Sequence, residues 1–550
     1  MKKLNYILIL LVFSLFFSPV INYAQIKISI LKNPIYADSK VTDKNNIEMY
    51  FNNLGKAYSP QTQSGSHWLI RQDNNEIVFD QSPWIVGKKN GEIVVSGGMW
   101  LTNYSPGPII NGQAAMLIHP EDSLRYRIYK INKGDDNSNP DYAEWPADFG
   151  APVNNQGQPL ISGDQVLWAC FNYLDSNITY PFSPYIKTDP LEVEIHQTVY
   201  LREGNQSDLQ DIFSNVIFLE YEIIYKGSEP IESAYFGLWS DIDFEPMWNN
   251  KPAVDIDLQT SYCWSSEDTI YTGDAPFAVG YSLLYGPVVE DQGSTAIFKG
   301  KSLQGYKNLP LTSFHGIGTD YPPDTSFGYI HSLDDAWNYA RGLNKNGNPY
   351  IDPTTSQQTA FPLSGDPVTN TGWLYPYPGT SGEAGVMFFS GPFTLAQNDT
   401  QWTMIALVPG LGNTNLHSIS NMREKVQILR SLSYDSLAFG NTPYAITDID
   451  EHNLAEIPQS YQLYQNYPNP FNPNTKISWQ SPVGSWQTLK VYDVLGNEVA
   501  TLVNEYKPAG NYEVEFNGHS DKGQNLSSGV YFYTLRAGNF IQTKKMIVIK

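Results

Sequence analysis

The sequence predicts a mainly β protein: a large, multi-domain, β-sandwich-like region with a few short helices, followed by a small C-terminal β-sandwich. The 550 residues include 42 glycines and 37 prolines, and aromatic residues (14%) are almost as frequent as charged ones (16%), which is typical of loop-rich β proteins. Apolar and polar residues alternate in many short runs bounded by turn residues, as in half-buried strands. Helical spacing of apolar residues is found in only two segments.

The N-terminus has the pattern of a secretory signal peptide. Lys2 and Lys3 precede the apolar run 7–17, and Ala24 offers a cleavage site, so residues 1–24 are expected to be removed. The apolar run is shorter than the roughly 20 residues of a transmembrane helix. No other long apolar segment follows, so we expect a soluble mature chain without a transmembrane segment.

The acidic charge lies between the two ends of the chain. The net charge is −22, yet the first 24 residues carry two lysines and no acidic residue, and residues 460–550 contain eight basic and six acidic residues. A surface this acidic disfavours nucleic acid as a partner, because the phosphate backbone is itself negative. It suits a solvated outer face or divalent cations.

Residues 25–120 are predicted to form a β-rich N-terminal module. Alternating runs at 46–51, 76–79, 83–86 and 91–95 are separated by polar or turn residues, which favours a set of short strands in one sheet.

Residues 121–440 are predicted to form a second β-rich domain. The alternation of leucine, tyrosine and isoleucine with glutamate over 219–225 indicates a strand whose one face is buried. Serine and glycine at the two ends suit a short helix over 332–342. Apolar residues at helical spacing predict a second helix over 418–432.

An acidic constellation predicts a calcium site. Asp241 and Asp243 end one predicted strand, and Asp255 and Asp257 begin another. Residues two apart on a strand point the same way. If the two segments approach each other, up to four carboxylates converge, and oxygen ligands in that number suit Ca²⁺. The alternative is a solvated acidic turn.

A second candidate calcium loop consists of Asp135, Asn137, Asn139 and Asp141, which place oxygen-bearing side chains at alternate positions. A proline stands where such a loop has its glycine, and another proline stands where it has its last glutamate. The alternative is a turn rich in Asp and Asn.

The chain has two cysteines, Cys170 and Cys263. In an oxidising periplasm they could pair, which would close a loop of roughly 90 residues and add ~4–5 kcal/mol to the free energy of unfolding. Because both lie among apolar neighbours, two separate buried thiols are an equal alternative.

No catalytic motif stands out in the sequence. There is no G-x-S-x-G nucleophile elbow and no H-E-x-x-H zinc motif, and the eight histidines are scattered singly. Paired carboxylates for glycoside cleavage come together in space and leave no mark in a sequence. We therefore favour a non-catalytic role in binding, adhesion or envelope structure, with glycans or cell-envelope components as partners. The alternative is a polysaccharide-active hydrolase.

After a predicted polar linker over 441–459, residues 460–550 alternate as short strands and turns. This pattern predicts a small antiparallel β-sandwich, and no acid, base or metal cluster gathers in its sequence. The conspicuous residues of the segment are a proline-rich run, two glycines and a basic end, namely Tyr467, Pro468, Asn469, Pro470, Phe471, Gly496, Gly529, Lys544 and Lys545.

In these residues the segment resembles the type A C-terminal sorting domain of type IX (Por) secretion cargo. The resemblance covers almost all of residues 460–550 and implies a small immunoglobulin-like β-sandwich. It also implies recognition of residues 460–550 by the type IX secretion machinery of a Gram-negative bacterium. The remainder of the chain would then be a passenger that is secreted or displayed on the outer-membrane surface.

The passenger also resembles a poorly characterised group of secreted proteins that carry this sorting domain. The resemblance spans most of residues 27–440 and rests on short runs, at 126–130, 144–146, 163–165, 238–243 and 365–368. It implies no particular activity.

Overall fold

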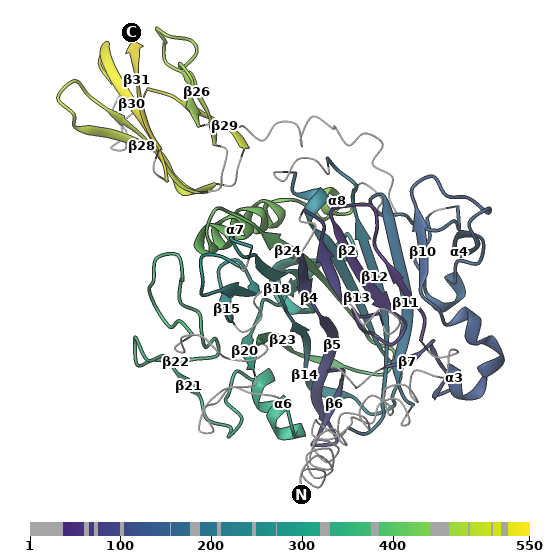
Figure 1. The fold of residues 1–550 in the computed structure, drawn as a ribbon. Coiled ribbons are helices and arrows are strands. Elements are labelled where there is room, and N and C mark those ends of the chain that lie inside the picture. The colour runs from purple at the N-terminus through teal and green to yellow at the C-terminus, as the bar shows by residue number, and fades with distance from the viewer. Residues whose placement is uncertain are drawn as a thin grey trace, which may run out of the picture. The chain divides into compact units, whose positions relative to one another are not determined.

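The computed structural model describes residues 37–549, apart from 60–64, 71–74, 100–103, 155, 176–187, 206–210, 245–248, 271, 319–329, 376–383, 440–460, 482–484, 508–509, 519–525 and 539. The expected signal peptide (1–24) and linker (441–459) lie outside the described residues. The chain divides into two compact units, residues 1–422 with 441–443 and residues 423–440 with 444–550. Both units are mainly β, as predicted (Figure 1).

A nine-stranded antiparallel sheet forms one layer of the first unit (Figure 1). Its central strand pair is β13 with β24, which are distant in sequence and pair along residues 217–224 and 400–407. The order along the sheet is β10 (Tyr129–Asn132), β11 (Gln165–Tyr173), β12 (Leu191–Leu201), β13 (Ile217–Tyr225), β24 (Thr400–Gly410), β17 (Ala278–Tyr285), β16 (Thr260–Ser265) and β15 (Asn250–Asp255), with β7 (Ser105–Pro106) paired to β11.

A five-stranded sheet forms the second layer. Its order is β20 (Ser313–Gly318), β23 (Ala384–Leu395), β14 (Ile231–Asp241), β5 (Asp80–Lys89) and β6 (Glu92–Gly97). The strands β5 and β6 come from the predicted N-terminal module, yet β5 pairs directly with β14 of the following region. The expected boundary near residue 120 therefore does not separate two compact units.

The two sheets enclose one hydrophobic core. Leu219 and Tyr221 of β13 belong to the same buried cluster as Phe236 and Leu238 of β14 and Ile405 of β24. The predicted alternation over 219–225 is confirmed, since its odd-numbered residues are buried and Glu220 and Glu222 point to the other face. Burial of apolar surface on this scale is the main force that holds the two layers together.

Helices cover the outer faces of the two sheets. α6 (Leu333–Ala340) packs on the five-stranded sheet through Ala336 and Tyr339, and it begins with a capping box at Ser332. The first half of α7 (Asn415–Ser431) packs on the nine-stranded sheet, where Met422 lies against two glycines of the sheet. These helices confirm the expectations for 332–342 and 418–432.

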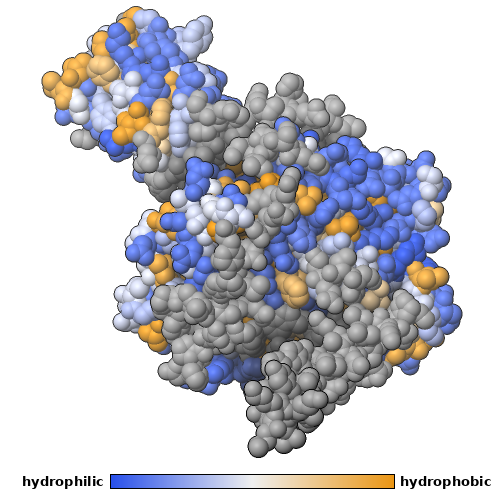
Figure 2. Space-filling view, viewed as in Figure 1, coloured by the Kyte–Doolittle hydropathy of each residue, from blue (hydrophilic) through white to orange (hydrophobic). Residues whose placement is uncertain are grey.

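The remaining elements of the first unit are short. Figure 2 shows a mostly hydrophilic surface over β10 and α4, in keeping with the acidic composition. The elements are β1 (Ser39–Val41), β2 (Ile47–Asn52), β3 (Ser66–Trp68) and β4 (Glu76–Val78) in one sheet, the pairs β8 (Ile109–Ile110) with β9 (Gln113–Ala114), β18 (Val288–Phe298) with β19 (Lys301–Asn308) and β21 (Tyr350–Ile351) with β22 (Gln358–Thr359), and the helices α3 (Ala115–Ile118) and α4 (Pro140–Ala143).

The second unit contains the predicted small β-sandwich, preceded by α8 (Tyr434–Leu437). Two antiparallel sheets face each other around a core that includes Trp479, Leu489 and Leu535. One sheet has the order β25 (Gln462–Leu463), β26 (Thr475–Ser481) and β29 (Gly510–Phe516). The other has the order β28 (Glu498–Lys507), β27 (Ser485–Tyr492), β30 (Gly529–Ala537) and β31 (Phe540–Val548).

Candidate functional site

The four aspartates of the first predicted calcium site do not converge. Asp241 ends β14 and Asp243 follows it, and the first residue of β15 hydrogen-bonds to the backbone between them. Asp255 and Asp257 lie at the other end of β15, five residues further on, or roughly 16 Å along an extended strand. The two pairs of aspartates therefore lie at opposite ends of β15.

Asp241 lies beside a buried lysine. Lys56 makes an ion pair of 2.7 Å with Asp80, and both side chains are almost fully buried. Asp80 is the cross-strand neighbour of Asp241. Burial lowers the pKa of Lys56, although Asp80 and Asp241 oppose that shift. Lys56 is therefore close enough to Asp241 for the two side chains to interact electrostatically.

The second predicted calcium loop is a turn rich in Asp and Asn. Asp135 accepts the backbone N–H of Asn132 at 2.8 Å, and the side chain of Asn139 accepts the N–H of Asp141 at 3.0 Å. Asp141 itself pairs with Arg127. The side-chain oxygens of Asp135, Asn139 and Asp141 therefore have hydrogen-bond or ion-pair partners within the protein.

The two cysteines are not joined in a disulfide. Cys170 lies on β11 and Cys263 on β16, and four strands separate them in the nine-stranded sheet. At roughly 4.8 Å per strand this is far more than the 4.4–6.8 Å between the Cα atoms of a disulfide. The possible disulfide is therefore excluded, and the alternative of two separate buried thiols is confirmed.

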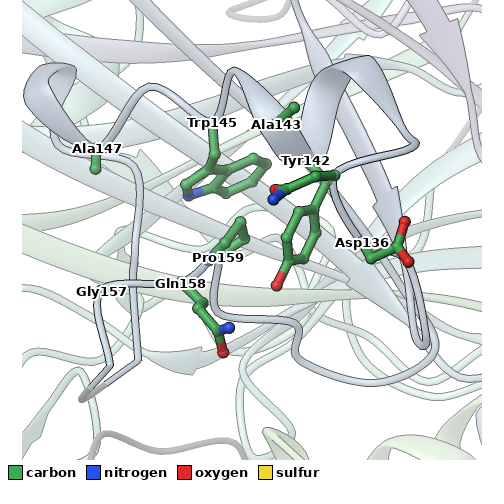
Figure 3. Close-up of a pocket in the computed structure, with 9 residues that line it drawn as sticks. Asp136, Tyr142, Ala143, Trp145, Ala147, Gly157, Gln158 and Pro159 are labelled. Carbon is green, nitrogen blue, oxygen red and sulfur yellow. The ribbon is translucent and has the colours of Figure 1, made fainter.

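A surface pocket of about 340 Å³ lies beside the turn that had been predicted to bind calcium. Tyr142 of α4 and the following Trp145 turn their rings toward Pro159, with Gln158 below them (Figure 3). The indole N–H of Trp145 donates to the backbone oxygen of Pro152 at 2.9 Å, which holds the ring in place. The lining residues are Asp136, Asn137, Tyr142, Ala143, Trp145, Ala147, Gly157, Gln158 and Pro159.

The pocket has one acidic side chain, that of Asp136. Hydrogen bonds from the hydroxyl and the backbone N–H of Ser138 lower the pKa of Asp136. The carboxylate is thus ionised at neutral pH and can accept hydrogen bonds from a ligand. A tight turn closes the opposite wall, in which Asn154 accepts the backbone N–H of Gln158 at 3.0 Å. The pocket combines an aromatic floor with a polar rim on short, internally bonded loops.

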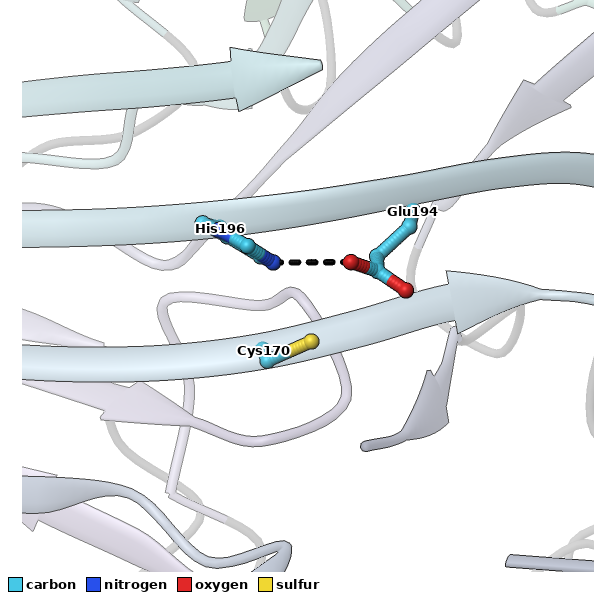
Figure 4. Close-up of side chains that lie close together, drawn as sticks. All are labelled: Cys170, Glu194 and His196. Atoms are coloured by element: carbon cyan, nitrogen blue, oxygen red, sulfur yellow. Dashed lines mark hydrogen bonds and ion pairs between the residues drawn. The ribbon is translucent and has the colours of Figure 1, made fainter. Parts of the chain in front are cut away.

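Behind the pocket lies a buried polar cluster that the sequence did not reveal. Cys170 on β11 and His196 on β12 are direct cross-strand partners, and Glu194 is two residues before His196 (Figure 4). The three residues are 3%, 6% and 3% exposed, respectively. His196 Nε2 is 2.9 Å from Glu194 Oε1, and one ligand atom of each residue lies within 4.8 Å of those of the other two.

The cluster connects to the pocket through neighbouring aromatic rings that meet edge to face or at a tilt. The ring of Trp168 lies 5.5 Å from that of His196 on one side and 6.3 Å from that of Trp145 on the other. Gly150, at the end of the 3-10 helix Ala147–Phe149, lies so close that a β-carbon there would be 2.4 Å from His196 Cε1. The segment that forms the pocket therefore also covers the cluster.

Burial and neighbouring charges shift the pKa values of Cys170, His196 and Glu222. Burial raises the pKa of Cys170 to about 11. Burial acts to lower the pKa of His196, but interactions with Cys170, Glu194 and Glu222 outweigh it and hold this pKa well above its usual value. Burial acts to raise the pKa of Glu222, but His196 and Lys299 hold it at about 2. The His196 imidazolium and the Glu222 carboxylate thus stabilise each other in the charged form.

In the second unit, the proline-rich run is bound to the last strand. Phe471 is 2% exposed in the core, and its backbone N–H donates to the oxygen of Ile547 at 3.0 Å. The side chain of Asn469 accepts the N–H of Ile547 at 2.9 Å. Tyr467, in contrast, is 81% exposed. The run therefore has one residue that anchors the fold and one that is presented to solvent.

The other conspicuous residues of this unit lie at its surface or in turns. Gly496 has φ of +83°, and it ends a turn in which Asp493 accepts the N–H of Leu495 at 2.9 Å. Gly529 begins β30, and the basic pair lies on β31 with Lys545 exposed. Like Tyr467, Lys545 is accessible to a partner.

Residues 465–550 match the family described as the secretion system C-terminal sorting domain. This segment is a type IX sorting domain. The resemblance found in the sequence is thereby confirmed, and the sorting domain is the part of the chain that engages the type IX machinery. The passenger is accordingly carried to the cell surface or out of the cell. In the part of the chain that the structure describes, no helix has the length and apolar character needed to cross a membrane.

The comparison with curated proteins gives no match. Among the solved structures that resemble the chain, three are covered over less than two thirds of their own length. A polysaccharide lyase has 9% identity over 94% of this chain and 46% of its own (TM-score 0.23). Dimeric latent PorU from Porphyromonas gingivalis has 11% identity over 70% of this chain and 31% of its own (TM-score 0.15). PorZ, a surface component of the type IX secretion system of the same bacterium, has 12% identity over 94% of this chain and 58% of its own (TM-score 0.18). Similarity at these TM-scores supports no conclusion about the passenger.

Neither the pocket nor the buried cluster was predicted from the sequence. Glu194 and His196 alternate with apolar residues along a strand, which is also the pattern of an ordinary solvent-facing edge. Only the pairing of β11 with β12 places Cys170 beside them, and only the segment around Gly150 buries them. Proximity of Trp145 and Tyr142 within one short run was the sole local signal for the pocket.

Proposed function

We propose that the passenger is a non-catalytic carbohydrate-binding protein, delivered to the cell surface or the medium by its sorting domain, and that the sugar binds in the pocket of Tyr142 and Trp145. The observation that carries this proposal is the combination of two aromatic side chains with Asp136, Asn137 and Gln158 at one small pocket. Aromatic rings offer apolar faces to the C–H faces of a sugar. The amides and the carboxylate offer hydrogen-bond partners to its hydroxyls.

The size and the charge of the pocket also favour binding. A volume of about 340 Å³ is at the lower end of small-molecule sites, which suits one or two sugar units. Glycoside cleavage generally needs two carboxyl groups, one of them a general acid with a raised pKa. The pocket has one carboxylate among its lining residues, and its pKa is lowered. A polysaccharide-active hydrolase at this pocket is therefore less well supported than a binding site.

The test measures binding of the purified passenger to a panel of soluble and insoluble bacterial and plant polysaccharides. We expect Tyr142→Ala and Gln158→Ala each to weaken binding about tenfold or more, which corresponds to ~1.4 kcal/mol. Tyr306→Ala is the matched control, because Tyr306 is a half-buried tyrosine on β19, away from the pocket residues. Equal affinity of the wild type, Tyr142→Ala and Gln158→Ala for every bound polysaccharide would show that the pocket is not the site.

A further inference from the structure

Cys170, Glu194 and His196 form a buried polar group on the outer face of the nine-stranded sheet. Their neighbours Val193 and Ile195 point into the core between the sheets, so Glu194 and His196 point the other way. Outward positions on a sheet are normally solvated, and ionisable groups are seldom fully buried unless they are paired or hold a metal. The burial of all three residues therefore indicates a specific role.

We propose that Cys170, Glu194 and His196 bind one Zn²⁺ ion. A thiolate sulfur, an imidazole nitrogen and a carboxylate oxygen are the three ligand types that zinc takes in proteins. Here one such atom from each residue lies within 4.8 Å of the other two. Three protein ligands leave the fourth tetrahedral position to a water molecule.

The distance between the ligand atoms of His196 and Glu194 needs only a small change to accept Zn²⁺. His196 Nε2 and Glu194 Oε1 are 2.9 Å apart. With bonds of about 2.0–2.1 Å, a tetrahedral zinc holds nitrogen and oxygen ligands roughly 3.3 Å apart. A shift of roughly 0.4 Å, within the reach of small side-chain rotations, opens the gap. Because Cys170 and His196 are direct cross-strand partners, the sheet itself fixes the distance between their backbones.

Neighbouring residues orient the side chains of Glu194 and His196. The backbone N–H of Ile109 donates to Glu194 Oε2 at 2.6 Å, which leaves Oε1 directed at His196. Glu222 Oε2 lies 3.4 Å from His196 Nδ1, and Lys299 in turn pairs with Glu222 at 2.9 Å. A carboxylate on the far nitrogen of a ligating histidine selects the tautomer whose other nitrogen faces the metal.

The experiment uses the purified mature chain, stripped with a chelator and titrated with Zn²⁺ and separately with Co²⁺. We expect one equivalent of each ion to bind. Bound Co²⁺ should show the charge-transfer absorption of a thiolate ligand. The exposed group of His119, Glu121 and Asp122 has no sulfur, so adventitious binding there cannot produce this absorption.

Two cysteine variants test whether Cys170 is the zinc ligand. Cys170→Ser should abolish the thiolate absorption and weaken zinc binding at least a hundredfold. Cys263→Ser, which alters a buried cysteine on β16, should leave both unchanged. Absence of a thiolate absorption in the wild type, or the same absorption in Cys170→Ser, would overturn the proposal. Since the wild-type absorption needs no variant, a variant that fails to fold leaves the test intact.

Discussion

The backbone N–H of Ile547 donates to the side-chain oxygen of Asn469 at 2.9 Å, so the first motif of the sorting domain is bound to the last strand of the chain. The backbone of Phe471 adds two hydrogen bonds to the same strand, with Ile547 at 3.0 Å and Ile549 at 2.9 Å. The two ends of the segment thus close one sandwich. Loss of either end should disrupt the other.

Phe471→Ala should destabilise the sorting domain and reduce secretion. Removal of a buried phenylalanine side chain typically costs 3–5 kcal/mol, which is a large part of the stability of a domain of this size. Tyr467→Ala, at an 81% exposed position in the same run, should change stability by less than about 0.5 kcal/mol. Pulse proteolysis of the full chain measures both. Equal resistance of Phe471→Ala and the wild type would show that this packing does not hold the domain together.

Deletion of residues 460–550 should leave the passenger folded but retained in the periplasm. The passenger strands and the sorting domain lie in different compact units, so the passenger core does not depend on the deleted strands. Fractionation of cells that express the truncated and complete chains measures the distribution, and the far-UV circular dichroism of the retained protein reports its folding. Normal amounts of truncated protein outside the cell would contradict the sorting role.

Both cysteines should be found as unlinked thiols that react slowly in the folded protein. Burial raises the pKa of Cys170 to about 11 and that of Cys263 well above its usual value, so in the metal-free protein neither is a thiolate at pH 8. Mass spectrometry of non-reduced peptides after alkylation in native and denaturing buffer measures linkage and reactivity. A Cys170–Cys263 linked peptide would contradict the strand order of the large sheet.

Asp80→Asn should destabilise the passenger by about 3–5 kcal/mol, because it leaves the buried Lys56 ammonium without its ion-pair partner. Replacement of both residues, as Lys56→Met with Asp80→Leu, should restore much of that loss, since two apolar side chains need no charge partner. Urea unfolding of the three proteins measures the differences. A double variant that is less stable than Asp80→Asn would show that the ion pair itself is required.

Stability should fall in acid through Glu222. Its folded pKa of about 2 lies below the ~4.3 of an unfolded glutamate. A group with a lowered pKa contributes stability above the unfolded value and loses it as the pH falls through the folded value. The shift corresponds to about 3 kcal/mol. Glu222→Gln should therefore be less stable than the wild type at pH 6, and the difference should shrink toward pH 2.

His196 adds the opposite dependence. Its folded pKa is raised, so its contribution is complete below about pH 6.5 and is lost as the pH rises through the folded value. The groups that face it are Cys170, Glu194, Glu222 and, through the glutamates, Lys226 and Lys299. The free energy of unfolding, measured from pH 3 to 9, reports both the loss in acid through Glu222 and the loss at higher pH through His196. Glu232→Gln, at an exposed position, is the control. Parallel profiles of Glu222→Gln and the wild type would contradict the assignment.

Local patterns determined the parts of this protein that depend on neighbours in sequence. The alternation over 219–225, the helices at 333–340 and 415–431 and the sorting motifs of residues 465–550 were all predicted. The alternation does not say which face of a strand is buried: within β30, Tyr533 and Leu535 are buried, whereas Val530 and Phe532 are not. Alternation gives a period, and a shift of one residue reverses the face.

By itself, the sequence determined that this chain is β-rich and carries a type IX sorting domain, because periodicity and short motifs are local properties. The tertiary structure alone decided that β5 joins β14 in one sheet, that four strands separate Cys170 from Cys263, and that Cys170 meets Glu194 and His196. Strand order and register depend on which distant apolar faces pack together, and short-range patterns do not record that choice. Burial of the Cys170 cluster required one further long-range event, the placement of Gly150 over His196.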